Sequence, residues 1–297
     1  MAMGTLRQIK RRIRSIESTA KITRAMELVA ASKMRRAQLS ALAGRPYAEK
    51  MRSVLADLAE TLGQVDPEML HPLLRRADEV RAIEIVMITP DRGLCGGLPA
   101  NLNRRAAQFI LEQQKEGRSA SVRVVAAGRK GRDFMRRTGQ SMVAEFTGLG
   151  DRLTYDEARP IAQVAMQDFV DGAADEVYLI YSHFVNTVVQ RAEVFKLLPV
   201  EPPDERETLA IDYIYEPDRE TVLAELLPRY VERQVYEAML EAIASEQSAR
   251  MVAMRNATDN ANELTRDLTL VYNKARQESI TGELLDITGG VEALKGK

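Results

Sequence analysis

Residues Arg229 to Thr281 read RYVERQVYEAMLEAIASEQSARMVAMRNATDNANELTRDLTLVYNKARQESIT, a run of 53 residues without a glycine or a proline. Both of these residues interrupt helices, and an average globular helix has only about 11 to 12 residues. A helix of this length would extend for about 80 Å, which exceeds the width of a compact domain. The stretch from Thr5 to Ala43 also lacks both residues, and 23 of the 28 glycines and prolines lie from Gly44 to Pro228. The sequence therefore predicts a long helix at each end and an ordinary domain between them.

Small and apolar residues recur along both end segments at alternating spacings of three and four, the pattern of a left-handed coiled-coil seam. Because the two segments flank one domain, an antiparallel pair is the simplest arrangement. We expect an N-terminal coiled-coil helix over residues 1–65, a central Rossmann-like α/β domain over 75–205 and a C-terminal coiled-coil helix over 210–297. The seam residues are Leu6, Ile9, Ile13, Ile16, Ala20 and Thr23 in the first segment and Ala257, Ala261, Leu264, Leu268, Val271 and Ala275 in the second.

Apolar side chains also lie outside these seams. Ile22, Met26 and Val29 share a different face of the first helix, and the far C-terminal segment is apolar almost all round. A two-stranded coil buries a single stripe of each helix, so the remaining apolar surface predicts enclosure by a partner protein. The apolar residues of the C-terminal segment are Ile280, Leu284, Leu285, Ile287, Val291 and Leu294.

Prolines and glycines predict where the C-terminal helix begins and ends. Pro228 is expected in the first turn of the long helix, where its missing N–H costs little, and a short helix over residues 218–227 is expected before it. Gly282 and the pair Gly289 and Gly290 are expected to loosen or end the far tip.

The middle of the chain alternates β-branched apolar runs with helical stretches, which is typical of βαβ units and a mostly parallel sheet. The predicted strands cover residues 82–89, 122–128, 176–184 and 188–200, and the predicted helices lie near 98–116, 130–138 and 155–171. A short turn around Asn186 and Thr187 joins the last two strands, so this pair is predicted to be antiparallel.

A glycine-rich turn, DRGLCGGL from Asp91 to Leu98, follows the first strand. Such a turn can hold a nucleotide phosphate on backbone N–H groups, but this one matches neither GxGxxG nor GxxxxGK[ST]. A structural or contact loop is the better interpretation. Cys95 has no histidine, lysine or second cysteine beside it, and His71 and His183 lack metal-ligand spacing. The residues therefore indicate no active site, no metal site and no cofactor.

Composition sets further limits. Residues 1–40 contain ten Lys or Arg against Glu17 and Glu27 alone, a charge of about +8, which indicates a solvated face, an acidic protein partner or nucleic acid. Cys95 is the single cysteine, which predicts no intrachain disulfide and a reducing compartment. No apolar run approaches the roughly 20 residues that span a bilayer.

Three blocks together resemble the gamma subunit of bacterial F-type ATP synthases. They are IRSIESTAKITRAMELVAASKMRRAQ (residues 13–38), TPDRGLCGGLPANLNR (89–104) and SEQSARMVAMRNATDNANELTRDLTLVYNKARQESITGELLDITGG (245–290). The likeness runs in order over the whole chain. It implies a non-catalytic central rotor shaft, turned by a proton-driven c-ring, which carries the catalytic sites of the beta subunits through their binding states during ATP synthesis.

The resemblance also implies partners and a location. Three alpha and three beta subunits would enclose the paired helices, and the epsilon subunit and the c-ring would lie beside the α/β domain. The chain would then be peripheral to the cell inner membrane, on its cytoplasmic side, and held there through the complex.

By the same resemblance, eight residues are expected to contact other subunits. Met26 occupies the position near which the shaft meets an acidic loop of beta, and Arg276 and Gln277 match residues that catch against polar groups of beta. The basic side chains after Met26 would suit acidic loops of beta, and the glycine-rich loop would touch beta as well. These additional contact residues are Lys33, Arg35, Arg36, Arg92 and Leu94.

Two other classes of function stay open from the residues alone. A nucleotide-binding α/β protein is favoured only by the first strand and its glycine-rich turn. A basic coiled-coil protein that binds nucleic acid is favoured by the charge of the first 40 residues. Against this second class, those residues share their helix with much apolar surface, and no aromatic stacking platform accompanies them.

Overall fold

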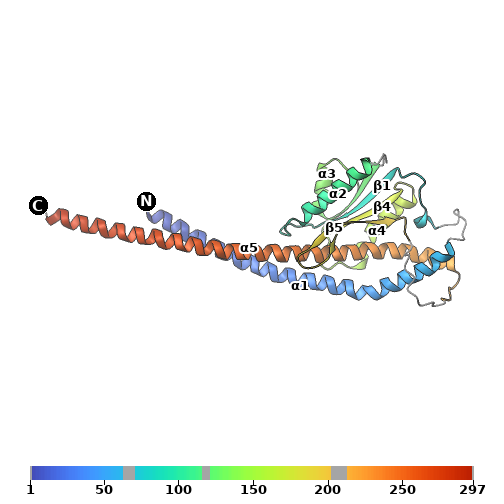
Figure 1. Ribbon diagram of the computed structural model, residues 1–297, viewed down its shortest axis with the longest axis horizontal. Coiled ribbons are helices and arrows are strands. Elements are labelled where there is room, and N and C mark those ends of the chain that lie inside the picture. The colour runs from blue at the N-terminus through green and yellow to red at the C-terminus, as the bar shows by residue number, and fades with distance from the viewer. Residues whose placement is uncertain (1, 63–70, 116–120, 202–212, 296–297) are drawn as a thin grey trace. The chain divides into compact units, whose positions relative to one another are not determined.

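A computed structural model describes residues 2–62, 71–115, 121–201 and 213–295 (Figure 1). The chain forms two compact units: the larger unit comprises residues 30–250, and the smaller unit combines residues 1–29 with 251–297. Two long helices, α1 (Ala2–Leu62) and α5 (Arg219–Lys295), each contribute to both units. The finer division of the chain at residues 65, 75, 205 and 210 stays a prediction.

The larger unit is built on a five-stranded sheet with the strand order β3-β2-β1-β4-β5. Strand β1 pairs in parallel with β2 and β4, β2 pairs in parallel with β3, and β4 pairs with β5 in antiparallel fashion. These pairings confirm the predicted mostly parallel sheet and its antiparallel last pair. The strands are β1 (Ala82–Ile88), β2 (Ser121–Ala127), β3 (Ser141–Phe146), β4 (Glu176–Phe184) and β5 (Gln190–Leu198).

The sequence did not predict strand β3. Its segment, SMVAEF, lacks the long β-branched runs of the other strands, and none of its side chains is fully buried. β3 lies at the edge of the sheet and pairs with β2 alone. An edge strand needs fewer apolar side chains than a central one, which leaves a weaker signal in the sequence.

Helices cover both faces of the sheet (Figure 1). Successive residues of a strand point to opposite faces, so β1 sends Ile85 to one apolar core and Val86 to the other. Helices α2 (Leu98–Lys115) and α3 (Arg129–Arg137) pack on the first face through Leu102 and Met135. Helix α4 (Tyr155–Val170), the 3-10 turn η2 (Pro72–Leu74) and the residues of α1 and α5 that belong to this unit form the second core.

Both long helices contain a proline. Helix α1 continues through Gly44 and Pro46, whereas α5 begins at Arg219 and passes through Pro228, before which a separate helix was predicted. The expected separate helix over 218–227 is therefore wrong. A proline inside a helix costs about 3 kcal/mol, but Leu227 and Val231 on either side of Pro228 are completely buried in the core. Their packing outweighs the cost of the proline.

Gly44 is required by a close approach within the larger unit. A Cβ at this position would lie 1.8 Å from the guanidinium Nη2 of Arg233 on α5. Arg233 is itself held by Glu237, to whose carboxylate its Nε and Nη2 donate at 2.9 and 2.7 Å. The glycine thus permits α1 to lie against this buried ion pair.

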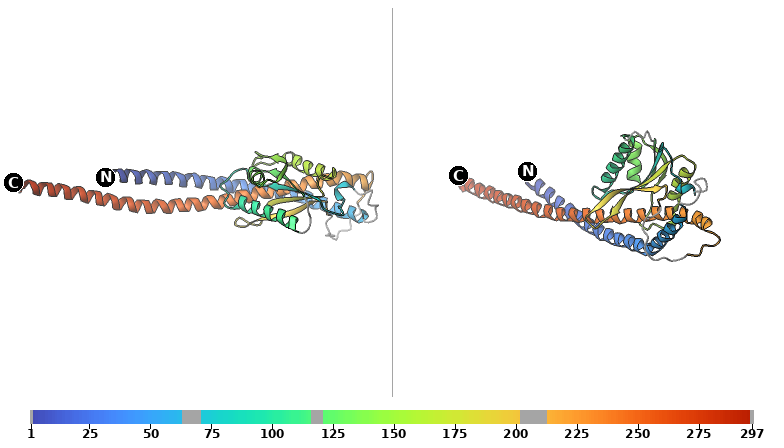
Figure 2. Two further views of the ribbon diagram at one scale, coloured as in Figure 1. Left: turned by 90° about the horizontal axis from the view of Figure 1, so that it is seen from above. Right: turned by 45° about the vertical axis from the view of Figure 1, so that its right-hand side comes forward.

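In the smaller unit, α1 and α5 run antiparallel (Figure 2). The hydroxyls of Thr23 and Thr258 lie 2.7 Å apart, and Nε of Arg255 donates to the carboxylate of Glu27 at 3.0 Å. Residue numbers therefore rise on α1 as they fall on α5, which confirms the predicted antiparallel pair. On α1, the predicted seam residues from Leu6 to Thr23 are half-buried or buried.

The seam of α5 differs in part from the predicted one. Leu264 and Val271 are 51% and 52% exposed, whereas Thr265 and Tyr272, one position later, are half-buried. The bond from Thr258 to Thr23 fixes which side of α5 faces α1, and seven-residue spacing from Thr258 reaches Thr265 and Tyr272. Two large apolar side chains are consequently left outside the pair.

The end of α5 extends past the N-terminus of α1 within the smaller unit (Figure 2). The helix continues through Gly282, Gly289 and Gly290 to Lys295, so it does not end at these glycines. A glycine weakens a helix interior by about 1 kcal/mol, which is less than the cost of proline and does not remove a hydrogen bond. In the described parts of the chain, no helix is both long enough and apolar enough to cross a membrane.

Candidate partner-binding surfaces

An apolar face of α1 is uncovered within the smaller unit. Ile22, Leu28 and Val29 are 58%, 59% and 53% exposed, and Met26 is half-buried. These residues lie outside the seam with α5, as the sequence predicted for Ile22, Met26 and Val29. Single exposed apolar residues are ordinary, but several on neighbouring turns of one helix are typical of an interaction surface.

The far end of α5 carries a second uncovered apolar segment, which we call the apolar tip. Its side chains are between 46% and 66% exposed, and the end of α5 that carries them extends past the N-terminus of α1 (Figure 2). The predicted tip residue Leu294 has a side chain outside the described part of the structure. The tip consists of Ile280, Leu284, Leu285, Ile287 and Val291.

Arg276 and Gln277 lie on α5 immediately before the apolar tip. Both side chains are exposed, and within the described chain neither forms an ion pair or a side-chain hydrogen bond. They are therefore available for contact with another molecule, and the contact with beta that the resemblance implies stays a prediction. The smaller unit thus contains three of the eight expected contact residues: Met26, Arg276 and Gln277.

The residue next to Met26 is a buried acid that the sequence reasoning did not single out. Glu27 is 4% exposed and accepts from Arg24 at 2.8 Å and from Arg255 at 3.0 Å. Burial by itself would raise the pKa of Glu27, but the hydrogen bonds from Arg255 and Arg24 outweigh it and hold the pKa below its usual value. Met26 therefore lies next to an ion pair, between Glu27 and Arg255, that joins the two helices.

The other five expected contact residues belong to the larger unit, and Lys33 is the one whose charge is paired within the chain. Its ammonium group pairs with the carboxylate of Asp151 in the connection between β3 and α4. Arg35 and Arg36 are exposed, and their side chains find no partner among the described residues. No local motif marks Asp151, because it is 118 residues away from Lys33 in the chain.

The glycine-rich loop after β1 is anchored by its first residue. The carboxylate of Asp91 accepts the backbone N–H of Arg129 at 2.9 Å and that of Gly148 at 2.7 Å. Arg92 is exposed, whereas Cys95 is 1% exposed, and burial raises the pKa of its thiol. Cys95 is thus an inert, buried part of the loop, which agrees with its interpretation as a small loop residue.

Leu94 stands out at the surface of this loop. Its φ is +65°, a left-handed conformation that a leucine adopts at a cost of about 1 to 2 kcal/mol. Its side chain is nevertheless 62% exposed, so burial does not offset this strain. A strained backbone that presents an apolar side chain to solvent is consistent with a contact residue.

We expect Leu94→Gly to stabilise the chain by about 1 kcal/mol, because glycine adopts a positive φ without strain. Urea unfolding of the full chain measures this difference, with Leu94→Ala as the control that keeps the strain. Equal midpoints for the glycine and alanine variants would contradict the strain at this position.

The Asp91 carboxylate of the glycine-rich loop accepts the N–H of Arg129 at the start of α3, a position that an anion can take at a helix N-terminus. The helix that follows the loop directly is α2, which begins at Leu98. The nucleotide-binding alternative rests on the turn before α2, and the geometry of the loop leaves it open.

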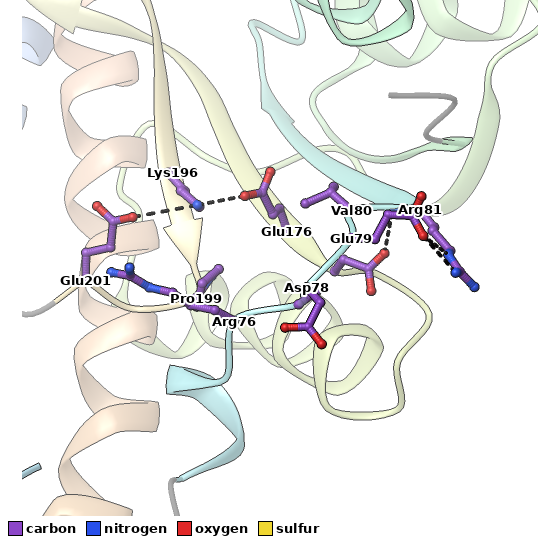
Figure 3. Close-up of a pocket in the computed structure, with 11 residues that line it drawn as sticks. Arg76, Asp78, Glu79, Val80, Arg81, Glu176, Lys196, Pro199 and Glu201 are labelled. Atoms are coloured by element: carbon purple, nitrogen blue, oxygen red, sulfur yellow. Dashed lines mark hydrogen bonds and ion pairs between the residues drawn. The ribbon is translucent and has the colours of Figure 1, made fainter. Parts of the chain in front are cut away.

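Charged side chains line a depression elsewhere in the larger unit, and several of them pair with one another. The depression, of about 510 Å³, lies at the amino ends of β1 and β4, where Lys196 pairs with Glu176 at 2.7 Å and with Glu201 at 3.6 Å (Figure 3). In the same depression, Arg81 pairs with Glu79 at 2.8 Å. The residues that the structure describes hold no group of three or more His, Cys, Asp or Glu suited to a metal ion.

Comparisons with known proteins point to one family. The sequence pattern of the family described as ATP synthase matches residues 5–294. The ATP synthase gamma chain of a Dehalococcoides mccartyi strain is 58% identical over 292 residues, which cover 98% of this chain and 100% of the relative. The ATP synthase gamma chain of a Chloroflexus aurantiacus strain is 53% identical, with 98% and 99% covered.

Solved structures agree with this sequence relationship. The central stalk and c-ring structure of the Tetrahymena thermophila mitochondrial ATP synthase contains a chain that is 27% identical, with a TM-score of 0.60, over 80% of this chain and 99% of that one. A chain of the Euglena gracilis mitochondrial ATP synthase shares the fold, with a TM-score of 0.66 at 18% identity over 98% of this chain and 95% of that one. With the paired long helices, the five-stranded sheet and the full-length sequence match, the chain belongs to the ATP synthase gamma chain family.

Proposed function

We propose that this chain is the central rotor shaft of an F-type ATP synthase and couples rotation of a proton-driven c-ring to the conformational cycle of the catalytic beta subunits. The chain itself is non-catalytic. The observation that supports this role most directly is the apolar tip, which extends beyond α1 and is at least 46% exposed at each side chain. Exposed apolar surface of this extent is typical of a site that a partner protein covers.

The partners follow from the family and from the two surfaces. Three alpha and three beta subunits would form the ring that encloses the apolar tip and the uncovered face of α1. The epsilon subunit and the c-ring would contact the α/β fold of the larger unit. The solved relative from Tetrahymena thermophila is described as a central stalk with a c-ring, which supports the same arrangement here.

The chemistry of the contacts suits a part that turns. Arg276 and Gln277 are exposed polar groups, and an exposed ion pair contributes only about 0 to 1 kcal/mol. Such contacts form and break at each step without trapping the shaft, whereas a desolvated Arg–carboxylate pair would hold much more tightly. Exposure of these side chains in the free chain is therefore compatible with repeated catching and release.

Seven of the eight contact residues fall into two groups in this proposal. Met26, Arg276 and Gln277 would meet the beta subunits at the paired helices, and Arg35, Arg36, Arg92 and Leu94 would meet them at the larger unit. Lys33 is assigned differently, because its charge is already paired with Asp151. It would act by holding the β3–α4 connection in place.

We expect Arg276→Ala to lower the torque of the assembled complex. The guanidinium of Arg276 has no partner within the described chain, so the substitution removes a charge that is available to the beta subunits. Single-molecule rotation of the complex measures torque, with Arg266→Ala, another exposed arginine of α5, as the matched control. Torque equal to that of the unsubstituted chain, together with an equal ATPase rate, would rule out this role for Arg276.

The location follows from the complex. The family places the chain in a membrane-bound assembly, and the chain would be peripheral to the cell inner membrane on its cytoplasmic side. Cell fractionation that places the chain with membranes, and its release when the catalytic part is stripped off, would support this location.

Native mass spectrometry of the complex that copurifies with the chain tests the proposed function. One copy of the chain with three copies each of two larger partners, and ATPase activity in that complex, is the expected result. A free monomer or a homodimer would contradict it. Nucleic acid retained in the presence of the two partners would instead favour the basic coiled-coil alternative.

A further inference from the structure

One short segment of α5 bonds to several loops at a single edge of the sheet. The strands β3, β2, β1 and β4 are parallel, so their carboxyl ends lie at the same edge. The connections that leave β1, β3 and β4 at this edge are each bonded to α5. The side chains involved, which we call the α5 clamp, are Ser245, Gln247, Ser248 and Arg250.

Two buried serines fasten strand β4 and the turn that follows it. The hydroxyl of Ser245 donates to the backbone carbonyl of Ser182 at 2.9 Å, and that of Ser248 donates to the carbonyl of Thr187 at 2.8 Å. Both serines are completely buried. Gln190 adds a longer contact, from its Nε2 to the hydroxyl of Ser248 at 3.5 Å.

The other two clamp residues fasten the remaining connections. Gln247 is 1% exposed, and its Nε2 donates to the carboxylate of Asp151 at 2.9 Å. The same carboxylate pairs with Lys33, so Asp151 joins α1 and α5. Arg250 donates from Nη2 to the carbonyl of Gly93 in the glycine-rich loop at 3.2 Å.

Arg250 is also oriented from within its own helix. Its Nη2 donates to Glu246 at 2.6 Å, one turn earlier. The side chains of both residues are mostly buried, at 12% and 18% exposed. The bond to Glu246 therefore orients the guanidinium of Arg250 toward the glycine-rich loop.

The clamp contacts the larger unit mainly through hydrogen bonds. From Leu223 to Leu240, α5 packs mostly through large apolar side chains, which are attracted without a preferred direction. Glu232 adds bonds to Tyr155 and Arg159 of α4, and Glu241 bonds His183 of β4. The clamp residues bond through polar side chains, and the neighbouring residues Ala244 and Ala249 are small. Hydrogen bonds have narrow distance and angle limits, so they oppose both sliding and rotation of the helix.

We propose that the α5 clamp is the torque joint between the α/β fold of the larger unit and helix α5. This inference rests on the proposed rotor function and names the residues that transmit the rotation. Arg250 is the last residue of the larger unit, and α5 continues from it as one unbroken helix. Rotation applied to the sheet domain thus enters α5 at the clamp.

The test measures how stiffly the domain is held in the assembled complex. A bead is attached through a cysteine placed at Gln108, an exposed residue of α2, and its angular spread is recorded during the pauses of rotation. Ser245→Ala with Ser248→Ala removes two clamp hydroxyls. Ser32→Ala with Ser40→Ala removes two exposed hydroxyls of α1 and is the matched control.

We expect the clamp variant to widen the angular variance by about 1.5-fold relative to the control, since two of the four clamp side chains lose their hydrogen bonds while those of Glu232 and Glu241 remain. Equal variances in the two complexes would overturn the clamp and leave the rotor function intact. Absence of rotation in a complex that contains the unsubstituted chain would overturn both the clamp and the rotor function. If the double variant does not assemble, the angular variance of the Ser248→Ala complex is compared with that of the Ser40→Ala complex, and equal variances would again overturn the clamp.

Discussion

A chain with Leu285→Ser and Ile287→Ser is expected to bind its alpha and beta partners about a hundredfold more weakly and to fold almost as stably as before. The two side chains are 66% and 63% exposed, and exposed substitutions usually change stability by no more than about 0.5 kcal/mol. Full burial of a Leu or Ile side chain is worth about 1.5 to 3 kcal/mol. Enclosure of the exposed part of both would therefore contribute about 3 kcal/mol, which is about a hundredfold in affinity.

Titration of the chain into alpha and beta subunits measures the affinity, and urea unfolding of the free chain measures the stability. Glu283→Ser with Asp286→Ser is the matched control, because it changes two exposed polar residues of the same helical segment. Similar affinities for the two double variants would show that no partner encloses the apolar tip. A large loss of stability in the free chain would show that the tip packs on the chain itself.

Glu84→Gln is expected to stabilise the larger unit by about 3 kcal/mol at pH 8. Glu84 lies on β1 with no exposed surface, and its carboxyl group faces the carboxylate of Asp168. Burial, together with the neighbouring carboxylate of Asp168, raises the pKa of Glu84 to about 9. Arg123, directly opposite on β2, is paired with Asp168 at 2.7 Å, so it compensates Glu84 only in part.

The sign of the pH dependence follows from proton binding. Between the ordinary pKa of 4.5 and the folded pKa of about 9, the folded chain keeps a proton on Glu84 that the unfolded chain releases. The stability of the unsubstituted chain should therefore fall as the pH rises through this window. The amide of the Glu84→Gln variant cannot ionise, so the advantage of the variant should grow from near zero at about pH 4.5 to its full value near pH 9.

Urea unfolding at pH 5 and at pH 8, followed by circular dichroism, measures this difference. Glu112→Gln is the control, since Glu112 is an exposed acid on α2 that pairs with Arg105 at the surface. The same loss of stability from pH 5 to pH 8 in Glu84→Gln and in the unsubstituted chain would contradict the raised pKa.

Much of the fold was predictable because its signals are local and periodic. The four strands with long β-branched runs, the helices between them and the antiparallel β4–β5 pair are all present. The missing strand, β3, is an edge strand with half-buried residues, for which alternation of polar and apolar residues is weak. The expected start of the long helix at Pro228 was wrong, because the local cost of a proline is smaller than the packing around it.

The candidate surfaces were predictable in position but not in detail. The uncovered apolar residues near Met26 and the apolar tip were predictable, because helical periodicity in the sequence places them outside the seam. The pairing of Lys33 with Asp151 does not, because it joins residues 118 positions apart. The sequence also did not indicate the burial of Glu27 between two arginines, because one of them, Arg255, lies on the other helix.

By itself, the sequence determined the family, the two long helices, the mostly parallel sheet and the apolar surface that a partner must cover, since each depends on residues that are near one another in the chain. The tertiary structure alone decided which side of α5 faces α1, and so left Leu264 and Val271 exposed. It also decided which loops the α5 clamp holds and that Glu84 is buried beside Asp168 and Arg123. These features depend on contacts between distant residues, where small differences in packing and desolvation set the outcome, and no periodic pattern in the chain encodes them.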